Sequence, residues 1–280
     1  MKKENRIDDV EVKKANIAHH ALEAELFERA HPEGSSVYEI SEVTRSMVFI
    51  AENSDTQDLC VDIGCGTGFA TNFELSLYKT VIATDISRQM LKVVKRRLGH
   101  FDSLNLVNCD AEFLPLKEEI ADLISISSVL HHLPKPFISL KKISSILKQD
   151  GFLYIVRDPS FRRMRNVFDF FGKMIRNFTK LLRRLHLFSS DPYATSIIIK
   201  GSSYSKVDVH YQTGFHVKHL AEFLNSNSFD VLSQYSYHWI YPSSNKGLLA
   251  YLLAKGNFFI ERIPLSNRFG RFISIIARKR

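Results

Sequence analysis

A glycine-rich loop lies at the centre of the stretch LCVDIGCGTGFATNF, residues 59–73. The apolar run from Leu59 to Ile63 precedes the loop, and a helical segment follows it. Glycines at a strand–loop–helix junction allow a tight turn and a close approach of the backbone to a ligand. The stretch therefore predicts the first βα unit of a nucleotide-binding α/β domain.

Short apolar runs and helical segments alternate along the chain around this loop. Strand-like runs lie at 59–63, 81–85, 104–108, 121–127, 152–156, 229–236 and 269–277, and helical segments lie at 87–98, 136–147 and 216–227. Alternation of this kind is typical of βαβ units. It predicts a Rossmann-like, doubly wound α/β sheet, with the best-defined part at residues 58–158.

Four segments follow from these patterns. We expect an N-terminal helical segment that caps the site at 1–57, the Rossmann-like core at 58–158, a basic insertion at 159–212, and the C-terminal part of the sheet at 213–280. The N-terminal segment shows a loose apolar stripe at Ile17, Leu22, Leu26 and Phe27, which predicts a helix there.

Composition excludes several classes of protein. Of the 280 residues, 45% are hydrophobic, which is enough for a core and argues against wholesale disorder. The three cysteines, Cys60, Cys65 and Cys109, have no metal-ligand spacing and leave an odd one over, so no metal site or disulfide scaffold is predicted. The polar start and the lack of an apolar run of about 18 residues favour a cytoplasmic chain. The longest apolar run, 247–260, is interrupted by Lys255 and Asn257.

The net charge of +8 is concentrated in one segment. Ser160–Phe188 holds eight basic residues and one acidic residue, which gives +7. Apolar residues from Met164 to Leu185 recur at alternating steps of four and three, as on one face of a helix. This predicts a basic amphipathic helix. Three roles stay open: a lid packed on the core, a lid that also contacts an anionic membrane, and a contact for nucleic acid.

Two common phosphate-binding motifs do not fit the loop. The dinucleotide motif G-x-G-x-x-G would place its third glycine at position 69, where the chain has Phe69, and the third glycine comes one residue earlier at Gly68. The P-loop motif would require Lys and Ser or Thr at positions that Phe69 and Ala70 occupy. A phosphate cradle is therefore disfavoured.

The actual spacing, G-x-G-x-G at Gly64, Gly66 and Gly68 with Asp62 before it, resembles motif I of the class I S-adenosylmethionine-dependent methyltransferases. Asp85 follows Gly64 by 21 residues, at the end of the second strand-like run. The stretches DAEFLP (110–115), ADLISISSVLHHL (121–133) and LKQDGFL (147–153) resemble later motifs of the same family in the same order. The resemblance covers residues 59–158.

The resemblance implies a seven-stranded sheet with its last strand antiparallel, a basic helical insertion after the fifth strand, and S-adenosylmethionine as the cofactor. It implies that Asp85 accepts hydrogen bonds from the ribose hydroxyls and that Ile86 packs on the adenine. The candidate cofactor-binding residues are Asp62, Gly64, Cys65, Gly66, Gly68, Asp85, Ile86, Asp110, Ala111 and Ser127.

Candidate catalytic residues lie at two places. His131 and His132 follow the fourth strand-like run, and His210 and Tyr211 precede a helical segment that often lines the acceptor site in this family. A histidine there would act as a general base if the acceptor carries a proton.

The acceptor is predicted by elimination and by resemblance. The chain has SSVL, residues 127–130, where amino-directed nucleic-acid methyltransferases carry N/D-P-P-Y/F and cytosine-C5 enzymes carry Pro-Cys. The L-P and H-H features are similar to the small-molecule branch, which includes ubiquinone and menaquinone biosynthesis enzymes. We therefore expect a small, hydrophobic acceptor. An RNA methyltransferase that uses the basic insertion, with nucleic acid as its partner, and a non-catalytic scaffold subunit stay open as alternatives.

Overall fold

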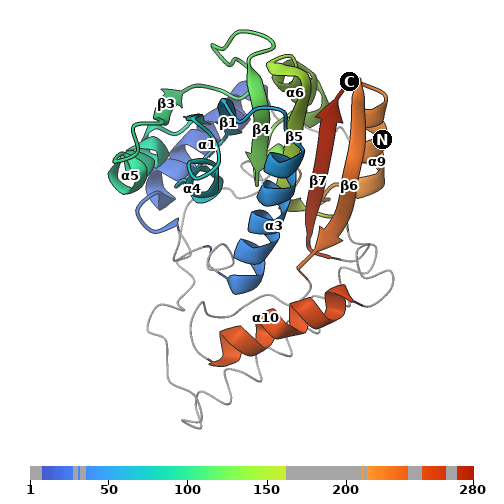
Figure 1. Cartoon of the computed structure of the whole chain (residues 1–280). Helices are drawn as coiled ribbons and strands as arrows, with labels where there is room; N and C mark the ends of the chain where they lie inside the picture. The colour runs from blue at the N-terminus through green and yellow to red at the C-terminus, as the bar shows by residue number, and fades with distance from the viewer. Residues whose placement is uncertain are drawn as a thin grey trace, which may run out of the picture.

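The computed structural model describes residues 8–27, 31, 36–161, 210, 213–238, 248–262 and 270–280. Within them the chain forms a seven-stranded sheet in the order β3-β2-β1-β4-β5-β7-β6 (Figure 1). The strands are β1 (Leu59–Ile63), β2 (Thr80–Asp85), β3 (Leu104–Asn108), β4 (Ala121–Ser127), β5 (Leu147–Pro159), β6 (Phe229–Tyr237) and β7 (Phe272–Lys279). β1 to β5 pair in parallel, and β7 is antiparallel to both β5 and β6. The predicted doubly wound sheet with an antiparallel last strand is confirmed.

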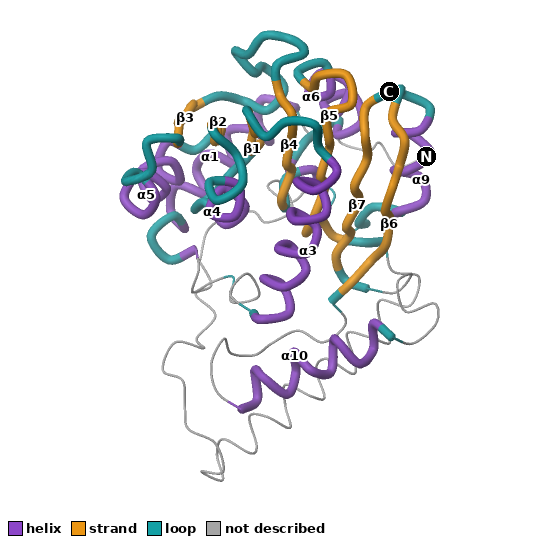
Figure 2. The backbone as a smooth tube through the Cα atoms, viewed as in Figure 1, coloured by secondary structure: helices purple, strands orange, loops and turns teal. Residues whose placement is uncertain are grey.

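Helices cover both faces of the sheet (Figure 2). Helices α3 (Val37–Asn53), α4 (Phe69–Glu74) and α5 (Arg88–Leu98) contribute to one buried cluster, and α6 (Pro136–Ser144) and α9 (Val217–Asn225) contribute to the other. The switch in strand order lies between β1 and β4, next to the glycine loop. In open α/β sheets, ligands bind outside the carboxyl ends of the strands at this switch point.

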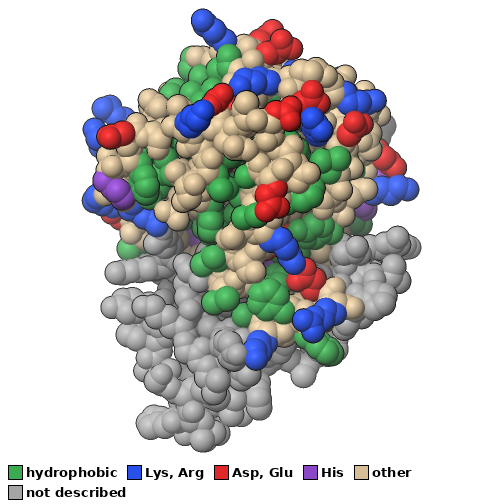
Figure 3. Space-filling model, viewed as in Figure 1, with side chains coloured by type: hydrophobic (Ala, Val, Ile, Leu, Met, Phe, Trp, Pro, Cys, Tyr) green, Lys and Arg blue, Asp and Glu red, His purple; other side chains and the backbone are tan. Residues whose placement is uncertain are grey.

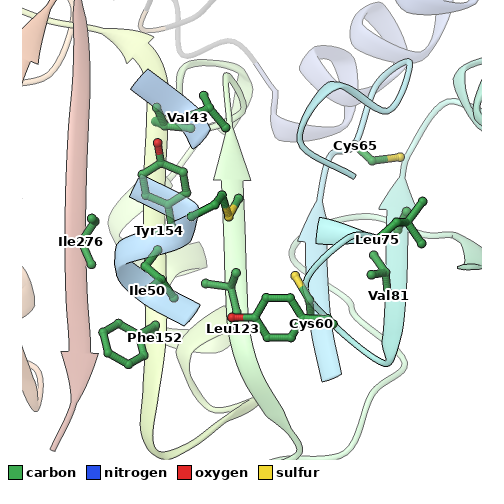
Figure 4. Close-up of a cluster of buried hydrophobic side chains, with 14 of the residues drawn as sticks. Val43, Ile50, Cys60, Cys65, Leu75, Val81, Leu123, Phe152, Tyr154 and Ile276 are labelled. Carbon is green, nitrogen blue, oxygen red and sulfur yellow. The ribbon is translucent and has the colours of Figure 1, made fainter. Parts of the chain in front are cut away.

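The two clusters follow from alternation along the strands. On β1, Cys60 belongs to the α3–α5 cluster and Val61 belongs to the α6–α9 cluster, because successive side chains of a strand point to opposite faces. Figure 4 shows Ile50 of α3 beside Phe152 and Tyr154 of β5, and all three are buried. Both faces of these strands are therefore core, which explains why the strands appear in the sequence as continuous apolar runs.

The N-terminal segment forms α1 (Asp9–Glu23) and α3, as predicted for a helical region. The apolar stripe that predicts this helix is not buried along its whole length. Ile17 is 39% exposed and Leu22 is 65% exposed, whereas the buried residues of α1 include His19 and Glu23. The buried side of α1 is polar because it forms a wall of the cavity described below.

Helix α10 (Leu248–Glu261) is a helix that the sequence patterns do not predict. Apolar residues follow one another along this stretch of sequence without a regular spacing, so no helical period marks it. It packs beside α3, where Arg45 forms an ion pair of 2.9 Å with Glu261. Among the described residues, no helix is long and apolar enough to cross a membrane.

The basic amphipathic helix is predicted within residues 160–188. Residues 162–209 lie outside the described residues, so almost all of this segment is not described. On the face shown in Figure 3, basic and acidic side chains are interspersed over the described part of the molecule.

Candidate active site

A cavity of about 330 Å³ opens at the carboxyl ends of β1, β2 and β4. Its wall includes ten of the residues predicted from the sequence: Gly64, Cys65, Gly66, Asp85, Ile86, Asp110, Ala111, Ser127, His131 and His132. The sheet brings them together because the ends of parallel strands meet at one edge. Phe27, Phe69, Leu133 and Phe272 add apolar surface to the same wall.

Asp85 is the buried carboxylate at the end of β2. Its Oδ2 accepts a hydrogen bond of 2.9 Å from the backbone N–H of Gly66, and its Oδ1 accepts one of 2.7 Å from Ser87. Burial raises the pKa of Asp85, and these two backbone donors oppose the rise. Each carboxylate oxygen can accept more than one hydrogen bond. The side chain is thus fixed in orientation and keeps acceptor capacity toward the cavity.

The glycine loop shapes the adjoining wall. Gly64 and Gly66 have φ values of +66° and +55°, a conformation that disfavours side chains. A Cβ at Gly64 would lie 2.5 Å from Val129, whereas a Cβ at Gly66 would meet no atom within 4 Å. Gly64 is therefore needed for packing, and Gly66 leaves open space beside its backbone.

Ser127 ends β4 at the cavity wall. Its Oγ is buried and has no hydrogen-bond partner in the described part of the chain. The next residue, Ser128, has φ +62°, and Arg157, which also lines the cavity, has φ +66°. Positive φ in residues other than glycine costs about 1–2 kcal/mol and concentrates at functional sites. The strained backbone at the ends of β4 and β5 supports a binding role for this edge of the sheet.

His131 is held by a buried aspartate. Asp158, near the end of β5, accepts hydrogen bonds from the backbone N–H of His131 at 3.0 Å and from its ring Nδ1 at 2.7 Å. Asp158 has no exposed surface. A carboxylate bound to Nδ1 favours the tautomer with the proton on Nδ1, which leaves Nε2 as the basic nitrogen. No sequence motif marks Asp158, which lies two residues after the predicted strand at 152–156.

Helix α1, from the N-terminal segment, forms one wall of the cavity. Lys13 bridges to Asp110 at 2.6 Å and also contacts Glu112, after β3. Partial burial disfavours the ammonium, but hydrogen bonds and charges from Asp110 and Glu112 outweigh it and raise the pKa of Lys13. The ion pair fixes α1 over the site, and no sequence motif marks Lys13.

Further along α1, His19, His20 and Glu23 line the cavity, and His31 and His132 lie next to them. Burial disfavours the charged carboxylate of Glu23, but hydrogen bonds from His19 and His31 prevail and lower its pKa to about 2. The sequence motifs do not predict this histidine-rich wall. A signal for it exists, because His19 and Glu23 are four residues apart on one helix face.

Two predicted cofactor-binding residues do not line the cavity. Asp62 is completely buried behind the loop, where it accepts a hydrogen bond of 2.6 Å from Thr71. Its side chain points to the α4 face of β1 rather than along the strand toward the cavity. Gly68 is the N-cap of α4, with φ +88°. Asp62 and Gly68 therefore hold the loop in place from behind.

The predicted acceptor-site pair at 210–211 is only partly described. The backbone N–H of His210 donates to the carbonyl of His131 at 3.0 Å, so His210 lies beside the site without lining the cavity. Tyr211 lies outside the described residues.

Asp62 and Glu74 form a pair of buried carboxylates joined by Ser125. Burial raises the pKa of Asp62 to about 6, and burial together with the charge of Asp62 raises that of Glu74. The folded chain thus binds more protons than the unfolded chain above pH 4. The stability that these protons give is complete below pH 4 and is lost as the pH rises through 6 and above.

Glu74→Gln is expected to stabilise the fold at pH 8, because it removes one buried charge and keeps the shape. We expect a Tm higher by about 2–6 °C at pH 8, from about 1–3 kcal/mol, and a much smaller change at pH 5.5. Thermal unfolding at both pH values checks this, with the exposed Glu25→Gln as control. A Tm lowered equally at both pH values would contradict the expectation.

The sequence matches known methyltransferases over its central part. Residues 61–155 match the family model described as a methyltransferase domain. Demethylmenaquinone methyltransferase of Staphylococcus haemolyticus is 26% identical over 120 residues, which are 41% of this chain and 50% of that protein. Malonyl-[acyl-carrier protein] O-methyltransferase of Marinomonas sp. is 29% identical over 132 residues, 46% of this chain and 49% of that protein. The chain spans about half the length of these curated relatives.

Solved structures agree in fold. Phosphoethanolamine N-methyltransferase 1 of Haemonchus contortus, in complex with phosphoethanolamine and S-adenosylhomocysteine, superposes with a TM-score of 0.57 at 14% identity. That match covers 100% of this chain and 51% of the other. N-methyltransferase NodS of Bradyrhizobium japonicum, in complex with S-adenosylhomocysteine, gives 0.52 at 10% identity and covers 87% and 88%. Residues 61–155 therefore match a methyltransferase domain, and the sheet shares its fold with methyltransferases solved in complex with S-adenosylhomocysteine.

Proposed function

We propose that this protein transfers a methyl group from S-adenosylmethionine to a small, apolar acceptor. The observation that carries the proposal is the single cavity that joins the Asp85–Gly66 corner to the His131–Asp158 pair. The first is suited to hold a nucleoside, and the second is suited to take a proton from an acceptor. Both face the same space.

The residues present fit the cofactor. The Asp85 carboxylate has acceptor capacity for the ribose hydroxyls, the Ser127 hydroxyl is a buried polar group that needs a partner, and Gly66 lets a ligand approach the backbone. When bound, S-adenosylmethionine supplies a methyl group on a sulfonium that is already activated for displacement. The main task of the protein is then to align the acceptor with that methyl group.

The chemistry of the acceptor is inferred from the other end of the cavity. His131 Nε2, with Nδ1 held by Asp158, can accept the proton that a hydroxyl or an acidic carbon loses as its bond to the methyl carbon forms. Leu133 and Phe27 line the same wall and favour an apolar acceptor. Of the curated relatives, demethylmenaquinone methyltransferase has a name in line with an acceptor of this kind.

Binding of S-adenosylmethionine tests the cofactor half. Asp85→Ala is expected to raise the Kd by about 10- to 100-fold, because one or two hydrogen bonds to a charged group are worth about 1.5–3 kcal/mol each. Isothermal titration measures this, with Asp85→Asn as a variant that keeps the side-chain size. Asp102→Ala, which removes an exposed carboxylate, is the control. An unchanged Kd for both Asp85 variants would overturn the assignment.

Methyl transfer tests the acceptor half. Labelled S-adenosylmethionine is incubated with the protein and fractionated cell extract, and label is counted in lipid, small-molecule and RNA pools. We expect the label in the lipid or apolar small-molecule pool. Label in RNA alone would favour the RNA methyltransferase alternative, and absence of transfer with intact cofactor binding would favour a non-catalytic scaffold.

A further inference from the structure

The last two turns of α1 bring three metal-ligating side chains to one wall of the cavity. One ligand atom each from His19, His20 and Glu23 lies within 4.8 Å of the others. His19 Nε2 and Glu23 Oε2 are 3.1 Å apart. His19 and Glu23 are buried, at 4% and 3% exposure, and His20 is half-buried.

The orientation of α1 is unusual for a surface helix. Two of its apolar residues, Ile17 and Leu22, are exposed and Val12 is buried, while His19 and Glu23 face inward. Burying imidazole and carboxylate groups is costly unless they are paired or coordinate an ion. A simple His19–Glu23 ion pair would account for two of the three side chains. The ring of His20 packs against those of His19 and His132, with centroids 5.2 and 5.0 Å away, and its ligand atom lies within 4.8 Å of those of His19 and Glu23.

Two imidazoles and one carboxylate are a known ligand set for divalent first-row transition metals. Zn²⁺ in a catalytic site binds three protein ligands and keeps one position open, with metal–nitrogen and metal–oxygen bonds of about 2.0–2.2 Å. In a tetrahedron such bonds place neighbouring ligand atoms about 3.3–3.5 Å apart. The His19–Glu23 pair, at 3.1 Å, is already near this spacing, and the ligand atoms of all three side chains lie within 4.8 Å of one another.

We propose that His19, His20 and Glu23 bind a divalent transition metal ion of the zinc class at the wall of the cavity. The open coordination position would face the cavity that Asp85 and His131 also line. The site does not depend on methyl transfer. Two further histidines border it without being needed as ligands: the ring of His132 is 5.0 Å from that of His20, and His31 Nε2 is 3.7 Å from Glu23.

The test uses the full-length chain without a polyhistidine tag, treated with chelator and then dialysed. Zn²⁺ is titrated in by calorimetry, and Co²⁺ is added as a spectroscopic probe. We expect one site per chain and visible d–d absorption of a low-coordinate Co²⁺ complex. Mg²⁺, which prefers oxygen ligands, should not compete. No cofactor or acceptor is present, so the result is independent of the proposed function.

Variants assign the site. Glu23→Gln and His20→Ala are each expected to weaken Zn²⁺ binding by at least about 100-fold, because each removes one of three ligands. The matched control is His219→Ala, since His216 and His219 form a second pair on the protein, with ring centroids 4.7 Å apart at the start of α9. His20→Ala should fold normally, because this side chain is only half-buried, and thermal unfolding checks the fold of each variant.

Several outcomes would overturn the proposal. They are no Zn²⁺ binding by the wild-type chain, binding that survives both Glu23→Gln and His20→Ala, and binding that His219→Ala abolishes. Intact Zn²⁺ binding in a chain that does not bind S-adenosylmethionine would instead count against the proposed function alone.

Discussion

Replacing Gly66 with leucine is expected to weaken S-adenosylmethionine binding by about 100- to 1,000-fold, or 3–4 kcal/mol, while the chain stays folded. The reason is that a Cβ at Gly66 meets no protein atom within 4 Å. The added side chain would therefore extend into the space beside the loop, at the cavity wall. Its positive φ costs about 1–2 kcal/mol of stability, which a domain of this size can bear.

Gly64→Ala is the matched contrast. Its Cβ would lie 2.5 Å from Cγ2 of Val129, in the core beneath the loop. We expect it to lower Tm more than Gly66→Leu does, although its added group is smaller. Calorimetric titration with S-adenosylmethionine and thermal unfolding of both variants separate the two effects. Tight cofactor binding by a folded Gly66→Leu variant would show that the ligand does not approach this backbone.

Local motifs predict the part of the site that one stretch of chain encodes. The glycine loop and Asp85 can be predicted because each lies at the end of a strand in a strand–turn–helix sequence. Such neighbouring units place these residues at the same edge of the sheet. Asp62 shows the limit of this reasoning. It adjoins the motif, but alternation along β1 turns its carboxylate toward Thr71 and away from the cavity.

The remaining site residues depend on contacts between distant segments. Asp158 matters because the end of β5 comes beside the residues after β4, where it meets His131. The polar side of α1 faces inward because the helix packs over the cavity and Lys13 pairs with Asp110. An apolar stripe normally marks the buried side of a helix. Here Ile17 and Leu22 are exposed, so the spacing of apolar residues does not show that His19 and Glu23 lie on the buried side.

Removing the His131–Asp158 pair is expected to have the largest effect on turnover. General acid–base catalysis contributes about 10²- to 10⁴-fold, so His131→Ala should lower kcat by that factor for an acceptor that must lose a proton. Asp158→Asn should lower it by a similar factor, because the amide no longer favours the tautomer with Nε2 as the base. The Kd for S-adenosylmethionine should stay within a few-fold of wild type for both.

The double variant distinguishes a catalytic unit from two independent defects. If Asp158 acts through His131, the combined loss in kcat should be close to that of His131→Ala alone and should not be the product of the two losses. Labelled methyl transfer into the apolar extract pool measures kcat, and thermal unfolding shows whether loss of the buried Asp158 carboxylate has damaged the fold. The control is His100→Ala, which replaces an exposed histidine that does not line the cavity. If a folded His131→Ala variant keeps the wild-type kcat, the acceptor reacts without help from this base. The inferred acceptor, a hydroxyl or an acidic carbon, would then have to be replaced by a nucleophile that has no proton to lose.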